Sequence, residues 1–419
     1  MFEGYRIAVV LVPMALVIAA PGIARAEERG ALPTPLRVGD AIRLARQSRS
    51  ELVSARARAD AAAQRPAIVS ALEDPQILPS IDHLPFMGGG ADMSLTIQQS
   101  FPLSHVRGHR RDAAEAETRR ELAQLARVDL DVELDAAVAF WMLFEIRETA
   151  KIVGEQRALA ARMVDAALAR FAASTGAEVD VLRAQLESAR LEGEQRSLVG
   201  ETHASEVMLN ASLARPVDAP ISELDGEVTD VSPPTTTQLA QTALGNRPEL
   251  RADRAEIARS EAEVSVMEAM YSPMAMVRTG PSYLMTDGLG WTLMVGLSIP
   301  LWREKLGAGV AEARAMVKVA NADLETSRRM IGGEGAAASA RVAAARERFL
   351  ALRDTIVPKA REVIAATLAA YTTNKVQLVS TIEAAQALWT VQRELVMAHR
   401  ELGLAWARLD RAIGKEVTR

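Results

Sequence analysis

The sequence predicts a mainly helical protein with a small β part, built from two tandem repeats. Short segments recur about 200 residues apart, with Ser50-Glu51-Leu52 returning as Pro248-Glu249-Leu250 and Ser100-Phe101-Pro102-Leu103 as Ser298-Ile299-Pro300-Leu301. The chain is rich in Ala, Leu, Glu and Arg and only 4% aromatic, which is typical of long helices. Because a repeat unit seldom buries its apolar face alone, we expect the function to lie in an assembled shape.

The chain divides into a removable leader and two repeats. Residues 1–26 read as a secretory signal peptide, because an apolar run from Ile7 to Ala20 precedes the small-x-small cleavage site Ala24-Arg25-Ala26. A membrane anchor is the alternative, but Pro13 interrupts the run, which is shorter than the about 20 apolar residues that cross a bilayer. We expect a first repeat at 27–215 with a hairpin at 76–103, a linker at 216–237, and a second repeat at 238–419 with a hairpin at 274–302.

Composition excludes several classes of function. The chain has no cysteine, which excludes disulfides, thiolate metal sites and a lipidated cysteine. Its net charge of −5 becomes −6 without the leader, which argues against nucleic acid as a partner. No Gly-rich phosphate loop, metal triad or nucleophile motif appears, so we expect neither an enzyme nor a cofactor.

The first repeat should open with an extended arm, Glu27–Leu36, and one helix from Asp40 to about Leu72. Asp favours a helix N-terminus, Pro66 is a candidate kink, and Asp74-Pro75 ends the helix. Its apolar stripe recurs at helical spacing: Ala41, Ala45, Leu52, Ala55, Ala59 and Ala62.

A hairpin and two long helices should complete this repeat. Residues 93–101 alternate between apolar and polar side chains, strictly as far as Gln98, which predicts a strand. Residues 76–86 form a poorer strand candidate, joined to it by the loop Gly88-Gly89-Gly90. A helix over about 107–171 would span roughly 97 Å, and after a turn at Gly176 a second helix returns to about Leu213.

The second repeat should follow the same order. We expect a helix over 238–270, strands over 274–285 and 291–299, a long helix over 305–371 and a final helix to about Ile413. Gly332-Gly333, Gly335 and Pro358 are candidate breaks in the long helix. The final helix carries a heptad seam typical of coiled coils: Leu388, Val391, Leu395, Ala398, Leu402, Ala405, Leu409 and Ala412.

The strands resemble those of outer-membrane β-barrels, because an apolar face alternates with a polar one and Trp291 and Trp302 lie near the two ends. A soluble hairpin packed on a core is the alternative. Four strands cannot close a barrel, and open edges are not tolerated in lipid, so two chains would give eight strands and three would give twelve. The expected lipid-facing residues are Leu95, Ile97, Phe101, Trp291, Leu293, Val295, Leu297 and Ile299.

The mature chain resembles the TolC family of outer-membrane efflux proteins. The resemblance rests on the duplicated Phe-Pro-Leu and Ile-Pro-Leu segments and on an aromatic residue, Phe171 or Tyr371, nine residues before Asp180 or Ser380. It implies a homotrimer that closes a twelve-stranded barrel in the outer membrane above an α-barrel tunnel of very long antiparallel helices in the periplasm. It also implies a periplasmic adaptor (a membrane fusion protein) and an inner-membrane resistance-nodulation-division pump as partners.

The same resemblance implies that the two helix turns are periplasmic tips. Ser174 and Asn374 stand where the family often has glycine, and Asn tolerates the left-handed conformation that a helix end favours. Asp180 and Glu383 are candidates for an acidic constriction, and solvated helix charges are the alternative. The expected adaptor-docking residues are Phe171, Gly176, Asp180, Leu182, Tyr371, Asn374 and Ser380.

Residues 74–103 resemble the heavy-metal (CzcC-like) branch of the family, which suggests metal cations as cargo. No cluster with metal-ligand spacing supports this, although a duct need not bind its cargo tightly. Four hairpin methionines could meet a soft cation, but packing or lipid contact is the simpler expectation: Met274, Met276, Met285 and Met294. A basic patch follows the first hairpin, and we expect a solvated collar there rather than a cargo or lipid site: His105, Arg107, His109, Arg110 and Arg111.

Two other functions remain open from the sequence. The duct could export drugs, or polypeptides as in type I secretion, in place of metals. A protein of another class, a periplasmic coiled-coil structural protein with no barrel, would be recovered in soluble extracts.

Overall fold

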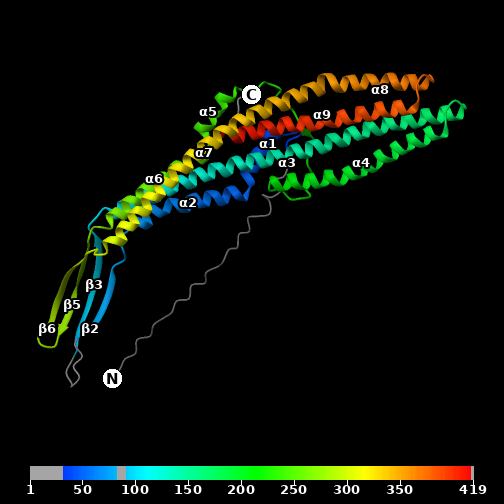
Figure 1. The fold of residues 1–419 in the computed structure, drawn as a ribbon. Coiled ribbons are helices and arrows are strands. Elements are labelled where there is room, and N and C mark those ends of the chain that lie inside the picture. The colour runs from blue at the N-terminus through cyan, green and yellow to red at the C-terminus, as the bar shows by residue number, and fades with distance from the viewer. Residues whose placement is uncertain (1–31, 83–90, 417–419) are drawn as a thin grey trace, which may run out of the picture.

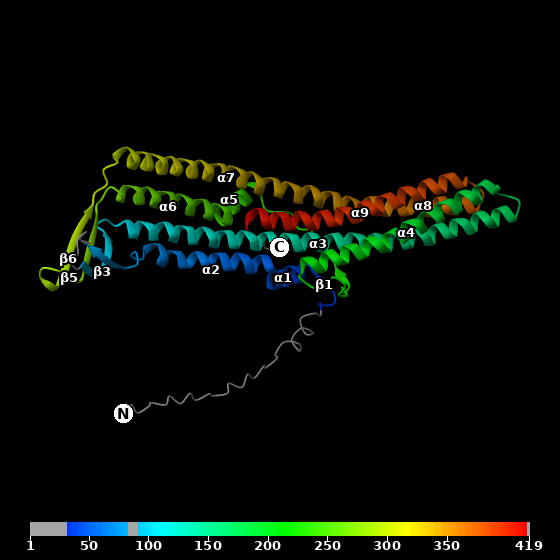
Figure 2. The same cartoon turned by 90° about the horizontal axis from the view of Figure 1, so that it is seen from below.

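The structure, a computed structural model, describes residues 32–82 and 91–416. The predicted leader, residues 1–26, and the predicted Gly88-Gly89-Gly90 loop lie outside these ranges. The molecule is elongated, with a sheet at one end and two helical turns at the other (Figure 1). Long helices run between the two ends, and the view from below shows the same order along the long axis (Figure 2).

Each half of the chain contributes the same succession of elements. The first half contains β1 (Leu36–Arg37), α1 (Val38–Ser48), α2 (Ser50–Ser70), β2 (Gln76–Asp82), β3 (Asp92–Pro102), α3 (Val106–Ala172) and α4 (Glu178–Ser212). The second contains β4 (Leu224–Asp225), α5 (Thr236–Asn246), α6 (Pro248–Ala269), β5 (Met274–Leu284), β6 (Gly288–Ser298), α7 (Arg303–Ala351), the π-helical turn η1 (Leu352–Ile356), α8 (Val357–Thr372) and α9 (Leu378–Ile413).

The single helix expected at the start of each repeat is wrong in both. The backbone is extended at Arg49, with φ −71° and ψ 130°, so α1 and α2 are separate helices. It is extended again at Arg247, with φ −59° and ψ 124°, between α5 and α6. The second break has a local cause, because a residue before proline, here Pro248, disfavours the helical conformation. Helix α1 also starts at Val38, so Asp40 lies in its first turn, where its carboxylate accepts the backbone N–H of Arg37 at 3.4 Å.

The long helix of the second repeat has no break at the glycines that were its candidate break sites. Helix α7 runs uninterrupted through Gly332, Gly333 and Gly335. The irregular turn is η1, which ends two residues before Pro358. Proline lacks the N–H that an α-helix requires, and a π-helical turn is one way in which a helix absorbs such a defect.

The sheet has the order β2-β3-β5-β6, and all its neighbours are antiparallel. Strands β1 and β4 form a separate parallel pair, in which Leu36 lies opposite Leu224. The end of the predicted extended arm is therefore held against the linker between the repeats.

The core is distributed along the helices in three clusters. Two lie in the middle of the molecule, where Trp141 of α3 and Trp406 of α9 are buried, and the third lies near the helical turns around Tyr371. The heptad seam of α9 lies mostly in this core, with Leu402 and Leu409 fully buried. Among the helices of the described ranges, none has the length and hydrophobicity needed to cross a bilayer.

Candidate functional site: an open sheet and paired helical tips

The four-stranded sheet has one largely apolar face that is open to solvent, interrupted by Gln99 and Thr279. Strand pairing places Ile77 opposite Ile97, Val277 opposite Val295 and Ala275 opposite Leu297, so these side chains share one face. Trp291 on this face is 70% exposed. Seven of the residues expected to face lipid lie within the strands, and all seven are exposed on this face: Leu95, Ile97, Phe101, Trp291, Leu293, Val295 and Leu297. The eighth, Ile299, follows β6 and is also exposed.

The opposite face of the sheet is polar and internally hydrogen-bonded. The Ser80 and Ser94 hydroxyls lie 2.7 Å apart, and Arg278 donates from Nε and Nη2 to Oε1 of Gln98 at 3.1 and 2.8 Å. The buried Thr96 hydroxyl donates to the Leu78 carbonyl at 3.3 Å. A sheet with one apolar and one polar face, both accessible, separates an apolar medium from water.

Three of the hairpin methionines lie on the polar face of the sheet. Met274 pairs with Ser298, Met276 with Gly296, and Met294 with Arg278, which places all three on the polar face. Of the two expectations for them, contact with lipid is therefore wrong for these three side chains, and packing within the sheet remains. Met285 lies in the turn that follows β5.

Both outer strands of the sheet have an open edge. Strands β2 and β6 are its first and last members, and neither has a second neighbour within the described ranges. Such an edge exposes a row of unpaired backbone N–H and C=O groups that can pair with another strand.

The two helical turns at the other end of the molecule have the same backbone. Ser174 and Asn374 both adopt the left-handed conformation, with φ of 57° and 62°. The following amides bond back to the preceding helix, with Thr175 N donating to the Arg170 carbonyl at 2.9 Å and Lys375 N to the Ala370 carbonyl at 2.8 Å. Such bonds satisfy the carbonyls that a helix end leaves free.

One arginine of the first turn binds the second turn. The Arg170 guanidinium lies 4.4 Å from the ring centroid of Tyr371 and donates to the Tyr371 carbonyl at 3.2 Å and to the side-chain oxygen of Asn374. Tyr371 is fully buried, and this burial raises the pKa of its hydroxyl, with Asp180 adding to the shift and Arg170 opposing it. Its counterpart Phe171 is 48% exposed, so the two predicted tip aromatics have different surroundings.

The remaining predicted tip residues surround this contact but do not converge on it. Asp180 is half-buried and Glu383 is exposed, and within the described ranges no hydrogen bond or ion pair joins them. Leu182 and Ser380 are exposed, and Gly176 packs its backbone against Arg170, where an added Cβ would lie 3.0 Å from the arginine Cβ. Sequence reasoning missed Arg170, whose only signal was its place directly before the aromatic Phe171.

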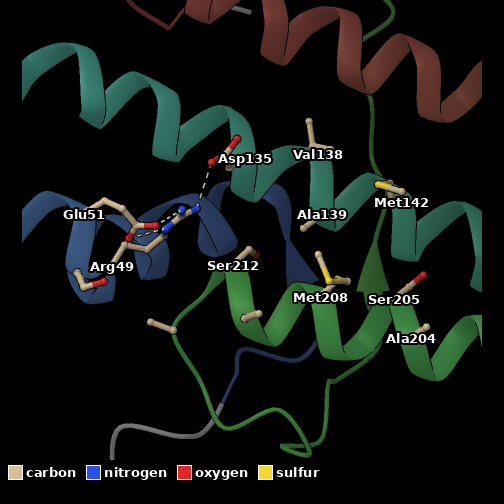
Figure 3. A pocket seen from close by; sticks show the side chains of 13 residues that line it. Arg49, Glu51, Asp135, Val138, Ala139, Met142, Ala204, Ser205, Met208 and Ser212 are labelled. Carbon is tan, nitrogen blue, oxygen red and sulfur yellow. Dashed lines mark hydrogen bonds and ion pairs between the residues drawn. The ribbon is translucent and has the colours of Figure 1, made fainter.

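The repeated Glu-Leu segments mark the helix breaks in the middle of the molecule. Arg49 pairs with Glu51 at 2.5 Å and with Asp135 of α3 at 3.3 Å. These three side chains border a pocket of about 580 Å³ between α2, α3 and α4, whose lining also includes Met142 of α3 and Met208 of α4 (Figure 3). The Arg49 guanidinium lowers the pKa of the Glu51 carboxyl to about 2. These contacts hold helices together, and among the described residues no group of three or more His, Cys, Asp or Glu side chains could hold a metal ion.

Comparison with known proteins relates this architecture to outer-membrane channels. Residues 239–415 match the family model described as "Outer membrane efflux protein". The chain is 24% identical over 303 residues, 72% of each protein, to the cobalt-zinc-cadmium resistance protein CzcC of Cupriavidus metallidurans. The resemblance predicted from the sequence, including that to the heavy-metal branch, is thereby confirmed.

Solved structures share the fold over nearly the whole chain. The structure of CusC, described in terms of folding and transmembrane channel formation, superposes with a TM-score of 0.79 over 99% of each chain at 15% identity. The outer membrane protein VceC of Vibrio cholerae gives a TM-score of 0.77 at 17% identity, over 90% of this chain and 96% of that one.

Proposed function

We propose that this chain, whose second half matches the outer membrane efflux family, is the outer-membrane duct of a tripartite system that exports heavy-metal cations. The observation that carries the proposal is the four-stranded sheet with one exposed apolar face, one polar face and two open edges. In lipid, the apolar face contacts acyl chains and the polar face lines water.

The open edges require sister subunits. Unpaired backbone groups cost several kcal/mol each in a bilayer, so β6 of one subunit would pair with β2 of the next until the sheet closes. Three subunits give twelve strands, the assembly that the family resemblance implies. The homotrimer then places the barrel in the outer membrane and the helices in the periplasm as a tunnel.

The helical tips are the proposed docking end. They lie at the far end of the molecule from the sheet (Figure 1), where a periplasmic adaptor and an inner-membrane pump of the resistance-nodulation-division type would approach. Exposed Phe171 and Leu182 supply apolar contact area for the adaptor. Three-fold symmetry would turn Asp180 and Glu383 into rings of carboxylates at the entrance, and such rings favour cations.

The proposed cargo rests on the relative named for cobalt, zinc and cadmium resistance. A passive exit duct does not need a tight site for its cargo, because conduction requires release. The helical tunnel and barrel therefore suit a conduit whose metal selectivity is set by its pump.

Complementation tests this proposal. The full chain is expressed in Cupriavidus metallidurans lacking CzcC, together with a variant in which β6 is made polar (Leu293→Asn, Val295→Asn and Leu297→Asn). We expect the wild-type chain to reach the outer membrane and to restore growth on cobalt, zinc and cadmium, and the variant to do neither.

Two results would contradict parts of the proposal. Recovery of the wild-type chain as a water-soluble periplasmic monomer contradicts the duct and favours a structural coiled-coil protein. If the chain forms outer-membrane trimers that restore resistance to drugs but to none of the three metals, the proposed duct stands and the proposed metal cargo is wrong.

A further inference from the structure

The polar face of the sheet carries one fixed positive charge. Arg278 of β5 lies on this face, opposite Gln98 on β3 and Met294 on β6. Both of the hydrogen bonds that hold its guanidinium go to the same atom, Oε1 of Gln98. That oxygen belongs to a neutral amide, so the contact fixes the position of the guanidinium without neutralising its charge.

The charge of Arg278 is not offset along the sheet. Among the residues described in the four strands, Arg278 is the only Lys, Arg or His, and the carboxylates are Asp82 and Asp92. These two pair with each other at the end of the strands farthest from the helices. Asp92 lies six residues from Gln98 on β3, which is about 20 Å along a strand. Because the Debye length is about 8 Å at physiological salt, the carboxylates do not compensate Arg278 at its own level.

We infer that Arg278 sets the ion preference of the barrel section of the duct, which favours anions over cations at this level. The inference rests on the proposed function, because only a closed barrel turns the polar face into the wall of a water-filled lumen. Three subunits place three copies of Arg278 at one height. Rings of arginine or lysine are the arrangement that favours anions in pores, and arginine keeps its charge throughout the physiological pH range.

A barrel of this size is narrow enough for the three charges to act on a passing ion. Twelve strands spaced about 4.8 Å apart and tilted by about 40° give a barrel about 24 Å across. Since an arginine side chain stands off the strand, an ion on the axis passes within about one Debye length, 8–10 Å, of each guanidinium. Walls of low dielectric constant focus the field further.

The preference at Arg278 is opposite in sign to the one proposed for the helical tips. There, the carboxylates of Asp180 and Glu383 favour cations, whereas the barrel presents a positive ring to ions that enter from outside. External metal cations therefore meet a repulsive level before they reach the tunnel. Exported cations cross the same level most readily together with anions that balance their charge.

Charged thiol reagents added from outside test the inference, in cells that carry the full-length protein in their outer membrane. The chain has no cysteine, so Ser100→Cys and Ser94→Cys each introduce a single thiol on the polar face of β3. Ser100 lies on the helix side of Gln98, two residues away, and Ser94 on the outer side, about 14 Å away. The modification rates by an anionic and a cationic methanethiosulfonate are measured for each thiol. Their ratio cancels the reactivity of the thiol itself.

The ratio at position 100 should follow the charge at position 278. We expect the anionic reagent to react faster there, and Arg278→Gln to lower the anion-to-cation rate ratio by about threefold or more. Arg278→Lys keeps the charge and should keep the ratio. Gln98→Ala removes the two hydrogen bonds but not the charge, and should keep the ratio as well. At position 94, beyond a Debye length from Gln98, Arg278→Gln should leave the ratio nearly unchanged.

Two results overturn the inference while leaving the duct intact. The first is a ratio at position 100 that is the same in the wild-type background and in Arg278→Gln, with both proteins recovered as outer-membrane trimers. The second is a ratio that falls equally in Arg278→Gln, Arg278→Lys and Gln98→Ala, because Arg278 would then act by holding the strands together. A protein recovered as a soluble monomer would instead remove the duct, and the inference with it.

Discussion

Arg247 donates from Nε to Glu249 at 2.9 Å across the break between α5 and α6. The first repeat makes the same pair at its own break, between Arg49 and Glu51. In each repeat a further carboxylate from the long helix joins the arginine at 3.3 Å: Asp135 in the first and Glu334 in the second. The duplicated Glu-Leu segments therefore preserve an ion pair at a helix break.

Arg247→Ala should destabilise the protein more than Arg49→Ala. The Arg247 side chain is 8% exposed and also donates to the carbonyls of Arg411 and Ala412. That of Arg49 is 15% exposed, and its partners among the described residues are carboxylates. Removing a buried partner leaves uncompensated charge and acceptors, so we expect a loss of about 3 kcal/mol at Arg247 and about 1 kcal/mol at Arg49. Chemical denaturation of the detergent-solubilised protein measures both, and equal losses would contradict the ranking.

Gly403→Ala and Gly193→Ala should change stability in opposite directions. A Cβ at position 403 would lie 2.2 Å from Cε2 of Trp141, so α9 and α3 would be pushed apart at a cost of about 1–3 kcal/mol. A Cβ at position 193 meets no atom of residues 32–82 or 91–416 within 4 Å, and alanine there should stabilise α4 by about 0.5–1 kcal/mol. Thermal unfolding of the two variants gives the sign, and a stabilised Gly403→Ala protein would contradict the packing described here.

The regular elements could be predicted because their signals are local. Alternation over 93–101 predicted β3, and the heptad seam predicted α9. Each pattern repeats every few residues, so a short stretch of sequence is enough to identify it. The break at Arg49 has no such signal, and only the structure shows the carboxylates around it. The break at Arg247 did have one in Pro248, but proline is also common in the first turn of a continuing helix.

Glycine was the misleading signal in the long helix. Each helical glycine costs about 1 kcal/mol relative to alanine, and packing outweighs that cost. Gly335 is buried, and an added Cβ would lie 3.3 Å from that of Ala243, so the absence of a side chain there lets α5 approach. The contact between Arg170 and Tyr371 at the tips could not be predicted from the sequence, because the two residues lie 201 positions apart.

Arg170→Ala should loosen the tips. The variant loses the cation–π contact with Tyr371 and the hydrogen bonds to Thr175 and Asn374, which together contribute about 2 kcal/mol. We expect faster amide hydrogen exchange, by about tenfold or more, at 171–177 and 372–376. Arg162→Ala is the control, because the bond that Arg162 makes within the described part of the chain goes to Ala158 of its own helix. Matching exchange in the two variants would show that Arg170 does not connect the two turns.

His399 should make stability fall at acidic pH. Its ring lies 4.8 Å from that of Phe144 and 5.0 Å from that of Phe349, its Nε2 lies 2.8 Å from the Gly226 carbonyl, and burial lowers its pKa below 6.5. A depressed pKa means that the unfolded chain binds the proton more readily. This contribution is therefore complete above pH 6.5 and is lost as the pH falls toward the folded-state pKa, with a slope of at most about 1.4 kcal/mol per pH unit.

His399→Gln tests this dependence, since glutamine can still donate to the Gly226 carbonyl but does not titrate. Denaturation curves between pH 7.5 and about pH 5 should have a smaller pH slope in the variant than in the wild type. An unchanged slope would assign the acid sensitivity to other groups.

Cross-linking of the two sheet edges tests the central claim most directly. The chain contains no cysteine, so Ser80→Cys on β2 can be combined in turn with Thr292→Cys, Gly296→Cys or Ser298→Cys on β6 without background. Within one subunit these strands are three spacings, about 14 Å, apart, which is too far for a disulfide. We predict that one of the three pairs gives covalent trimers in the outer membrane; monomers alone with every pair, in a protein recovered from the soluble fraction, would contradict the account.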